Sequence, residues 1–594
     1  MRPYINNMTE TTFQKDHTTL DFPLNVYAHG LYLQEGKVDY LHYALFNQGE
    51  SLTKVQVAQQ RSTDLLLARL PPPPCRILEI GIGLGTTASM LAERGYTITG
   101  ISPDAQQVAL AKQCVKDNVS FECVTYEAFS APAASYDVIL LQESAQYLQS
   151  LTLFNKAHQL LAKPGFILIA DEFSLQRTPK YATYGLPSLT YTLAQASRCG
   201  FNLTEQVDLS TPAAPTVDYL LWVIEKHQAR LLTDLDLKPV VLDELLTSLR
   251  EYQQKYRDGH YGYALLSFVK TPPPRWQITT VTTQDKETVR ELFSEVFQSQ
   301  QMTEAHWEWK YGQDRGLGIA AWRDGKMVAY YGSVMREIHY LGQSKFAAQI
   351  TDVMVSAKER GVFTQRGAFF LTAATFLENY MGYGARTWLG YGFPTQQAMK
   401  IAQRLGLYAQ VGKMIELRWQ TTPGKSLIWT RIRHLQPEHS QQNQLIINKL
   451  WQKMASCLQT ALVGVRDFPY VQHRYCSHPH RHYELLLVTK RFSGRALGIV
   501  IIQREQDICR MMDFIGDLKH IPEVIKQVRR MAGLWGMKQV IVWITANFLT
   551  AFPQQEAEQH DLQIPIPHNI WSQGVPPEEV DGHWWLMAGD TDFL

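Results

Sequence analysis

The stretch RILEIGIGLGTTASMLAERGYTITGIS, residues 76–102, decides the fold of the first part of the chain. Its pattern predicts a buried strand, a glycine-rich turn, a helix and a second strand. Gly81, Gly83 and Gly85 form the turn, where a backbone without side chains lets amide groups approach a ligand at the positive end of the helix. We therefore expect a ligand-binding site at this turn.

The spacing of the glycines favours one kind of ligand over another. A dinucleotide-binding turn has the pattern G-x-G-x-x-G and faces a pyrophosphate, whereas this turn reads E-x-G-x-G-x-G from Glu79 to Gly85. A carboxylate just ahead of the turn would repel a pyrophosphate, but it suits a ligand that carries an ammonium group. S-adenosylmethionine has that group, a positive sulfonium and no phosphate. We expect this cofactor here, with an NAD-binding or inactive fold as the alternative.

The surrounding sequence predicts a doubly wound, Rossmann-like α/β domain. Apolar runs at residues 119–124, 136–141 and 165–170 alternate with helical stretches, as in parallel strands joined by crossover helices. A final strand is expected at Tyr261–Lys270, and the prolines that follow it mark a domain boundary. We assign residues 1–272 to this domain.

The rest of the chain has a pattern of hairpins. Asp324-Gly325 between two apolar strands is typical of a two-residue hairpin turn. A similar order of strands followed by a helix occurs twice, which indicates a weak internal duplication. We expect two α+β units, at residues 276–425 and 440–594, with Trp584 and Trp585 in a last buried strand.

Residues 25–225 resemble the class I S-adenosylmethionine-dependent methyltransferases. The segments DYLHYALFNQGESLTKVQ (39–56), GISPDAQQ (100–107) and TYEAF (125–129) are similar to the cyclopropane-fatty-acid and mycolic-acid synthase branch. The resemblance implies that Tyr40 closes over the methionine part of the cofactor. It also implies positions for a further set of residues: Ser102, Pro103 and Gln107 near the ribose, and Tyr126 and Glu127 beside the adenine.

The same resemblance bears on the reaction. Cyclopropanation in that branch uses a bicarbonate held by a glutamate and a histidine, and the matching positions here are Gln146 and Tyr147. A cysteine of the branch is replaced by His42. Simple methyl transfer to oxygen, nitrogen or carbon is therefore favoured, and it requires a base only if the acceptor is protonated. The candidate bases are His42, Glu143 and Tyr147, each of which could equally be a structural polar residue.

Residues 351–408 resemble the core of the GCN5-related N-acetyltransferases, in which a turn before a helix binds the pyrophosphate of acetyl-CoA. The family pattern is Q/R-x-x-G-x-G/A, whereas this chain has ERGVFTQRGAF at residues 359–369. By the resemblance, acetyl-CoA or another acyl-CoA would contact Arg360, Gly361, Arg366 and Gly367. The irregular spacing leaves open that the region binds a substrate or partner without catalysis. The second unit has no such turn, so CoA affinity is expected only in the first.

Composition limits the remaining possibilities. The formal charge is +1 with no long run of one sign, which argues against binding to nucleic acid or to an anionic membrane. We find no signal peptide and no apolar run of about 18 residues, and we expect a cytoplasmic protein without a membrane span. Seven scattered cysteines argue against a disulfide scaffold. The stretch at residues 473–483 has four histidines and a cysteine that could ligate zinc only with a matched partner, so we expect no metal site. A small-molecule or carrier-bound substrate is expected, and the oligomeric state stays open.

Overall fold

The computed structural model describes residues 17–113, 118–182, 185–298, 301–362, 364–422, 424, 427–436 and 441–591. The chain divides into two compact units, and we describe each by itself. The first unit takes in residues 1–177 and 185–279, and the second takes in residues 178–184 and 280–594. In the described part of the chain, no helix is long and apolar enough to cross a membrane.

The first unit is built on one seven-stranded sheet with the order β3-β2-β1-β4-β5-β7-β6. Its strands are β1 (Arg76–Ile80), β2 (Thr97–Ser102), β3 (Val119–Cys123), β4 (Tyr136–Gln142), β5 (Leu161–Ser174), β6 (Phe201–Asp208) and β7 (Tyr261–Lys270). Neighbouring strands from β3 to β5 are parallel, whereas β7 is antiparallel to both β5 and β6. The strand order reverses beside β1, which places ligand sites at the carboxyl ends of β1 and β4.

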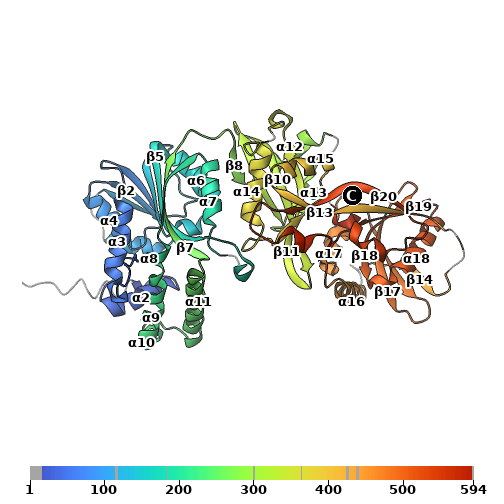
Figure 1. Cartoon of the computed structure of the whole chain (residues 1–594), viewed down its shortest axis with the longest axis horizontal. Helices are drawn as coiled ribbons and strands as arrows, with labels where there is room; N and C mark the ends of the chain where they lie inside the picture. Colours follow the sequence, from blue (N-terminus) through green and yellow to red (C-terminus); the bar gives the residue numbers. More distant parts are fainter. Residues whose placement is uncertain are drawn as a thin grey trace, which may run out of the picture. The chain divides into compact units, whose positions relative to one another are not determined.

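Helices cover both faces of this sheet (Figure 1). On one side lie α3 (Val55–Leu67) and α4 (Thr86–Glu93), and on the other lie α6 (Ser150–Leu160) and α7 (Leu189–Arg198). Leucines of α3 and α4 share a buried core with the apolar side chains of β1 and β4. The predicted doubly wound α/β fold is confirmed.

A helical insertion between β6 and β7 was not predicted from the sequence. It contains α9 (Pro215–Lys226), α10 (Gln228–Asp234) and α11 (Pro239–Arg257), which pack on α2 (Leu24–Glu35) around a separate apolar core. Because tyrosines of α11 contact the end of β5, the insertion covers the carboxyl end of the sheet.

The second unit contains two mixed sheets. Strands of the first sheet include β9 (Gly316–Arg323), β10 (Lys326–Tyr340), β11 (Gln343–Val355), β12 (Leu389–Tyr391), β15 (Leu462–Gly464) and β21 (Trp584–Trp585). The second sheet has the order β14-β16-β17-β18-β19-β13-β20. Its strands are β14 (Thr430–His434), β16 (Glu484–Lys490), β17 (Ala496–Glu505), β18 (Ile508–Gly516), β19 (Gln539–Thr545), β13 (Tyr408–Gln420) and β20 (Glu558–Asn569).

Each of the two α+β units expected from the sequence contributes strands to the other unit's sheet. Strand β13 pairs with β19 and β20 in the second sheet, whereas β15 and β21 join the first sheet beside β10. The expected hairpin is present between β9 and β10, with positive φ at Asp324 and Gly325. Trp584 and Trp585 are buried in β21, as predicted. The division at residues 425–440 stays a prediction.

Candidate active site at the glycine turn

The three glycines of the turn between β1 and α4 differ in what surrounds them. All three have positive φ, between 51° and 82°. A Cβ atom at Gly81 would lie 2.6 Å from the Ser144 Cβ, and one at Gly85 would lie 2.8 Å from the Ala111 Cα. A Cβ atom at Gly83 would have nothing within 4 Å. Close packing therefore requires Gly81 and Gly85, while Gly83 borders open space that a ligand can enter.

Glu79 is a buried carboxylate at the end of β1, two residues before the turn. Its Oε2 atom is buried and has no hydrogen-bond partner. Burial raises its pKa to about 8. An unpaired carboxyl of this kind is unfavourable unless a cation or a donor meets it. The position therefore fits a ligand that brings an ammonium group, as S-adenosylmethionine does.

The predicted ribose-contacting residues lie together in the turn after β2. The Ser102 hydroxyl donates to Gln107 Oε1 over 3.0 Å and accepts the Asp104 amide over 3.2 Å. The backbone carbonyl of Pro103 lies 3.6 Å from the Cys123 sulfur. This turn is next to the glycine turn, because the Gly81 amide donates to the Ile101 carbonyl over 2.9 Å.

The turn after β2 also contains an acidic residue, Asp104, that the sequence analysis did not single out. Ser102 ends β2, and Asp104 lies two residues later in the same turn. Its Oδ1 atom accepts the amides of Gln106 and Gln107 at 2.7 and 3.2 Å. Asp104 thus caps the start of α5 (Ala105–Gln113).

The two residues predicted to flank the adenine differ in exposure. Tyr126 is buried, and its hydroxyl donates to the Leu153 carbonyl over 3.1 Å. Lys156 Nζ donates to the carbonyls of Tyr126 and Glu127 at 2.6 and 3.0 Å, while the Glu127 side chain is exposed. Of the two side chains, only that of Glu127 is free to meet a ligand through its polar atoms.

Tyr40 and His42 lie in the segment that crosses the start of α4. The Tyr40 hydroxyl donates to Gln60 Oε1 over 2.7 Å, and the Thr86 hydroxyl donates to the Asp39 carbonyl. His42 Nδ1 lies 2.9 Å from the Tyr43 carbonyl, and its Nε2 lies 2.9 Å from the Thr63 hydroxyl oxygen. A carbonyl only accepts, so Nδ1 carries the proton. Burial lowers the pKa of His42 to about 4, and both ring nitrogens are already bonded.

Glu143 is the first residue after β4 and has a strained backbone, with φ of 61°. It is adjacent to Ser144, which packs against Gly81 of the turn. The Tyr263 hydroxyl donates to Glu143 Oε1 over 2.9 Å, and the Tyr43 amide donates to the same oxygen. Burial, and then the charge of Glu172, hold the pKa of Glu143 well above its usual range. In its ionised form, a carboxyl with a raised pKa is a stronger base than an ordinary carboxylate.

Two further carboxylates at the end of β5 surround Glu143. Glu172 accepts the hydroxyls of Tyr252 and Tyr256 at 3.0 and 2.5 Å, and burial raises its pKa. Burial also raises the pKa of Asp171 to about 7. The sequence carries one signal for them, an acidic pair inside the apolar run IADEF. The partner tyrosines come from the insertion, which no motif marks.

Tyr147, the third candidate base, lies in a short 3-10 turn, Ala145–Tyr147. Its side chain is 79% exposed, whereas the Gln146 amide beside it donates to Asp171 Oδ2 over 3.0 Å. Tyr147 therefore lies on the solvent side of the carboxylate cluster that Glu143, Asp171 and Glu172 form. Glu143 and His42 are both partly buried, and of the three candidates only Glu143 directly precedes Ser144, which packs against Gly81 of the glycine turn.

The four residues predicted to contact acyl-CoA surround one turn of the second unit, between β11 and α14 (Ala368–Tyr380). Gly367 is the N-cap of α14, and no side chain caps this helix start. Gly361 has φ of 92° with no atom near its Cβ position. Arg360 and Arg366 are exposed, and Arg360 Nε donates to the Val355 carbonyl over 2.9 Å. Free amides at a helix start can hold an anion.

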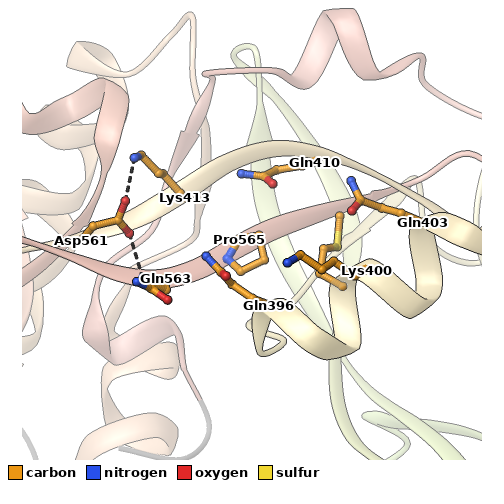
Figure 2. Close-up of a pocket in the computed structure, with 9 residues that line it drawn as sticks. Gln396, Lys400, Gln403, Gln410, Lys413, Asp561, Gln563 and Pro565 are labelled. Atoms are coloured by element: carbon orange, nitrogen blue, oxygen red, sulfur yellow. Dashed lines mark hydrogen bonds and ion pairs between the residues drawn. The ribbon is translucent and has the colours of Figure 1, made fainter.

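Another concave surface of the second unit has a different character (Figure 2). It is a groove of about 300 Å³ lined by one face of α15 (Gln396–Arg404) and by β13 and β20. Its Lys413 and Asp561 form a 2.7 Å ion pair with each other, and the polar side chains along it are exposed. The groove has none of the buried, unpaired groups that mark the glycine turn. Among the described residues, no group of three His, Cys, Asp or Glu could hold a metal ion.

Comparison with known families agrees with this geometry. Residues 78–169, which include Glu79, the glycine turn and Glu143, match the family described as methyltransferase domain. Residues 277–409, which include the turn before α14, match the acetyltransferase (GNAT) domain. The chain therefore carries a methyltransferase domain with a Rossmann-like fold, followed by a GNAT domain. The resemblances to methyltransferases and to GNAT acetyltransferases are confirmed at the level of these two domains.

Individual relatives match the methyltransferase domain. Over 126 residues the chain is 29% identical to the ubiquinone biosynthesis O-methyltransferase of Methylocella silvestris, covering 21% of this chain and 48% of that protein. Over 116 residues it is 28% identical to the enzyme of the same name from Agrobacterium fabrum, covering 19% and 46%. The chain thus spans about half the length of the curated relatives it matches.

Solved structures with a similar fold include the cyclopropane synthase MmaA2 from Mycobacterium tuberculosis, with a TM-score of 0.37, 17% identity and coverage of 45% of this chain and 100% of that chain. Geranyl diphosphate C-methyltransferase from Streptomyces coelicolor A3(2) has a TM-score of 0.34 at 14% identity, covering 45% and 100%.

Proposed function

We propose that the first unit transfers a methyl group from S-adenosylmethionine to a small or carrier-bound acceptor. One observation carries this proposal: Glu79 has a buried, unpaired carboxyl oxygen four residues before the open backbone of Gly83. The cofactor supplies an electrophilic methyl carbon when it is bound. Glu79 would meet its ammonium group, and the turn that contains Ser102, Pro103 and Gln107 would lie along its ribose.

We assign the role of proton acceptor to Glu143. It lies beside the glycine turn, and its raised pKa makes the ionised carboxylate a stronger base toward an acceptor such as a hydroxyl. An oxygen acceptor agrees with the names of the relatives from Methylocella silvestris and Agrobacterium fabrum. His42 is less suited because both of its ring nitrogens are bonded within the protein. Tyr147, exposed at the rim of the cluster, would contact the acceptor.

Binding of S-adenosylhomocysteine tests the cofactor site without knowledge of the acceptor. In calorimetry with the full chain, Gly83→Val should abolish binding, because its side chain would fill the open space of the turn. Gly36→Val is the matched control, since Gly36 also has positive φ and open space but caps the end of α2. Equal affinity in the Gly83 variant and the parent, or tight binding of NAD by the parent, would refute the proposal.

For the second unit we propose acyl-CoA binding at the turn of Arg360, Gly361, Arg366 and Gly367. The uncapped start of α14 supports this proposal. Residues 440–594 would form a second, degenerate unit. In support, α18 (Ile521–Leu534) connects the parallel strands β18 and β19 as α14 connects β11 and β12. The alternative is a non-catalytic protein whose GNAT half recognises a ligand or partner, which the irregular turn would permit.

A further inference from the structure

Three large apolar side chains stand exposed together at one tip of the second sheet of the second unit. Ile428, Trp429 and Phe492 are 66%, 70% and 76% exposed. Trp429 directly precedes β14, and Phe492 lies in the turn between β16 and β17. Because Thr430 of β14 pairs with Lys490 of β16, the two segments end at the same tip. Single exposed apolar residues are common, whereas a group of them marks an interaction surface.

The tip is held in place by the backbone. The Arg491 amide donates to the Trp429 carbonyl over 2.9 Å, and the Gly494 amide donates to the Lys490 carbonyl over 3.0 Å. The rings of Trp429 and Phe492 lie 6.0 Å apart at an angle of 71°. The two rings thus contact each other while most of their surface faces solvent. Their replacement should leave the core of the sheet intact.

Positive charge surrounds the tip. Arg431 and Arg495 are exposed, and neither has an ion-pair partner within the described ranges of the chain. Arg491 precedes Phe492 in the chain, its amide is bonded to the Trp429 carbonyl, and its guanidinium donates to the Leu427 carbonyl over 3.2 Å. Lys490 is paired with Glu523 over 2.8 Å and is therefore neutralised. Within the described ranges, the apolar tip is therefore bordered by two exposed arginines without an ion-pair partner, Arg431 and Arg495.

We infer that this tip docks on the surface of a membrane that contains anionic phospholipid. Tryptophan and phenylalanine bury their rings at the boundary between headgroups and acyl chains, while arginines attract the phosphates. The chain's formal charge of +1 gave no sign of such affinity. At ordinary salt, charges interact with a surface only over about 10 Å. The affinity for an anionic membrane therefore depends on the local charge of the tip and not on the net charge of the chain. The inference is independent of the methyltransferase and GNAT sites.

Co-sedimentation of the full chain with vesicles tests this inference. Vesicles of phosphatidylglycerol and phosphatidylcholine should bind the parent at low salt, and vesicles of phosphatidylcholine alone should bind it at least about tenfold more weakly. Trp429→Ser with Phe492→Ser should abolish binding to both. Arg431→Gln with Arg495→Gln should remove the preference for the anionic vesicles and the sensitivity to salt.

The matched control is Leu341→Ser with Phe346→Ser, which removes apolar side chains that are 38% and 51% exposed elsewhere in the second unit. This variant should bind as the parent does. The inference fails if the parent binds neither kind of vesicle, a result that would point to a protein partner for the tip. It fails equally if the tip variant still binds, or if the control loses as much affinity. Unchanged far-ultraviolet circular dichroism and an unchanged cooperative thermal transition establish that each variant is folded.

Discussion

Arg466 and Asp590 form an ion pair in which neither side chain has any exposed surface, with 2.6 Å between Nη2 and Oδ2. Arg466 Nε also lies 2.8 Å from Oδ1 of Asp513, which is equally buried. Asp513 belongs to β18, whereas Asp590 lies in the last turn that the structure describes, Ala588–Asp590. One guanidinium therefore ties the C-terminal segment to the second sheet of the second unit.

Replacing Arg466 by methionine should destabilise the second unit by about 3–5 kcal/mol, because two buried carboxylates would lose their cation. The measurement is the free energy of unfolding in urea, followed by tryptophan fluorescence. Lys538→Met is the control, since it removes a cation from a 2.6 Å pair with Asp507 that is open to solvent. A fall in stability that is as large for Lys538→Met as for Arg466→Met would contradict this account.

Binding of S-adenosylhomocysteine should release a proton from Glu79. At pH 7 a carboxyl with a pKa of about 8 is mostly protonated, and an ammonium group beside it favours the ionised form. Calorimetry in buffers with different ionisation enthalpies should show release of up to about one proton, which Glu79→Gln should abolish. Glu93→Gln, an exposed site at the end of α4, should release as much as the parent. Equal release by the Glu79 variant would show that another group titrates.

The stability of the first unit should fall as pH rises from about 6.5 to 8. Burial raises the pKa of Glu79 to about 8 and that of Asp171 to about 7 in the folded state. A carboxyl whose pKa is higher in the folded state than in the unfolded state contributes fully to stability at pH values below its unfolded pKa. It loses this contribution as the pH rises through its folded pKa. His42, whose folded pKa is lowered to about 4, acts in the opposite direction but only below about 6.5. Thermal unfolding at several pH values checks this, and Glu79→Gln should flatten the dependence.

The parts of the fold that were predicted correctly are those that a short stretch of neighbouring residues specifies. The glycine turn follows from three glycines on consecutive odd positions, and the β9–β10 hairpin follows from Asp324-Gly325. Pairing of β13 with β19 joins segments more than a hundred residues apart, and no local pattern encodes such a pairing. For the same reason, the meeting of Glu172 with Tyr256 became visible only in the structure. From their spacing alone, Gly81, Gly83 and Gly85 were all expected to bind the ligand. The structure shows that Gly81 and Gly85 are required for close packing, whereas Gly83 borders open space.

Two exposed arginines, Arg360 and Arg366, lie in the turn before α14. Arg360→Ala with Arg366→Ala should lower the affinity for acetyl-CoA at least about tenfold, because the irregular turn leaves the phosphates dependent on side-chain charge. Calorimetry with acetyl-CoA measures this, and S-adenosylhomocysteine binding to the same variant should not change. The control is Arg386→Ala with Arg404→Ala, which removes two exposed arginines of the same unit. If the variant bound acetyl-CoA as the parent does, the turn would not be the site. A parent that binds no acetyl-CoA at all would instead favour a GNAT domain that recognises another ligand without acyl transfer.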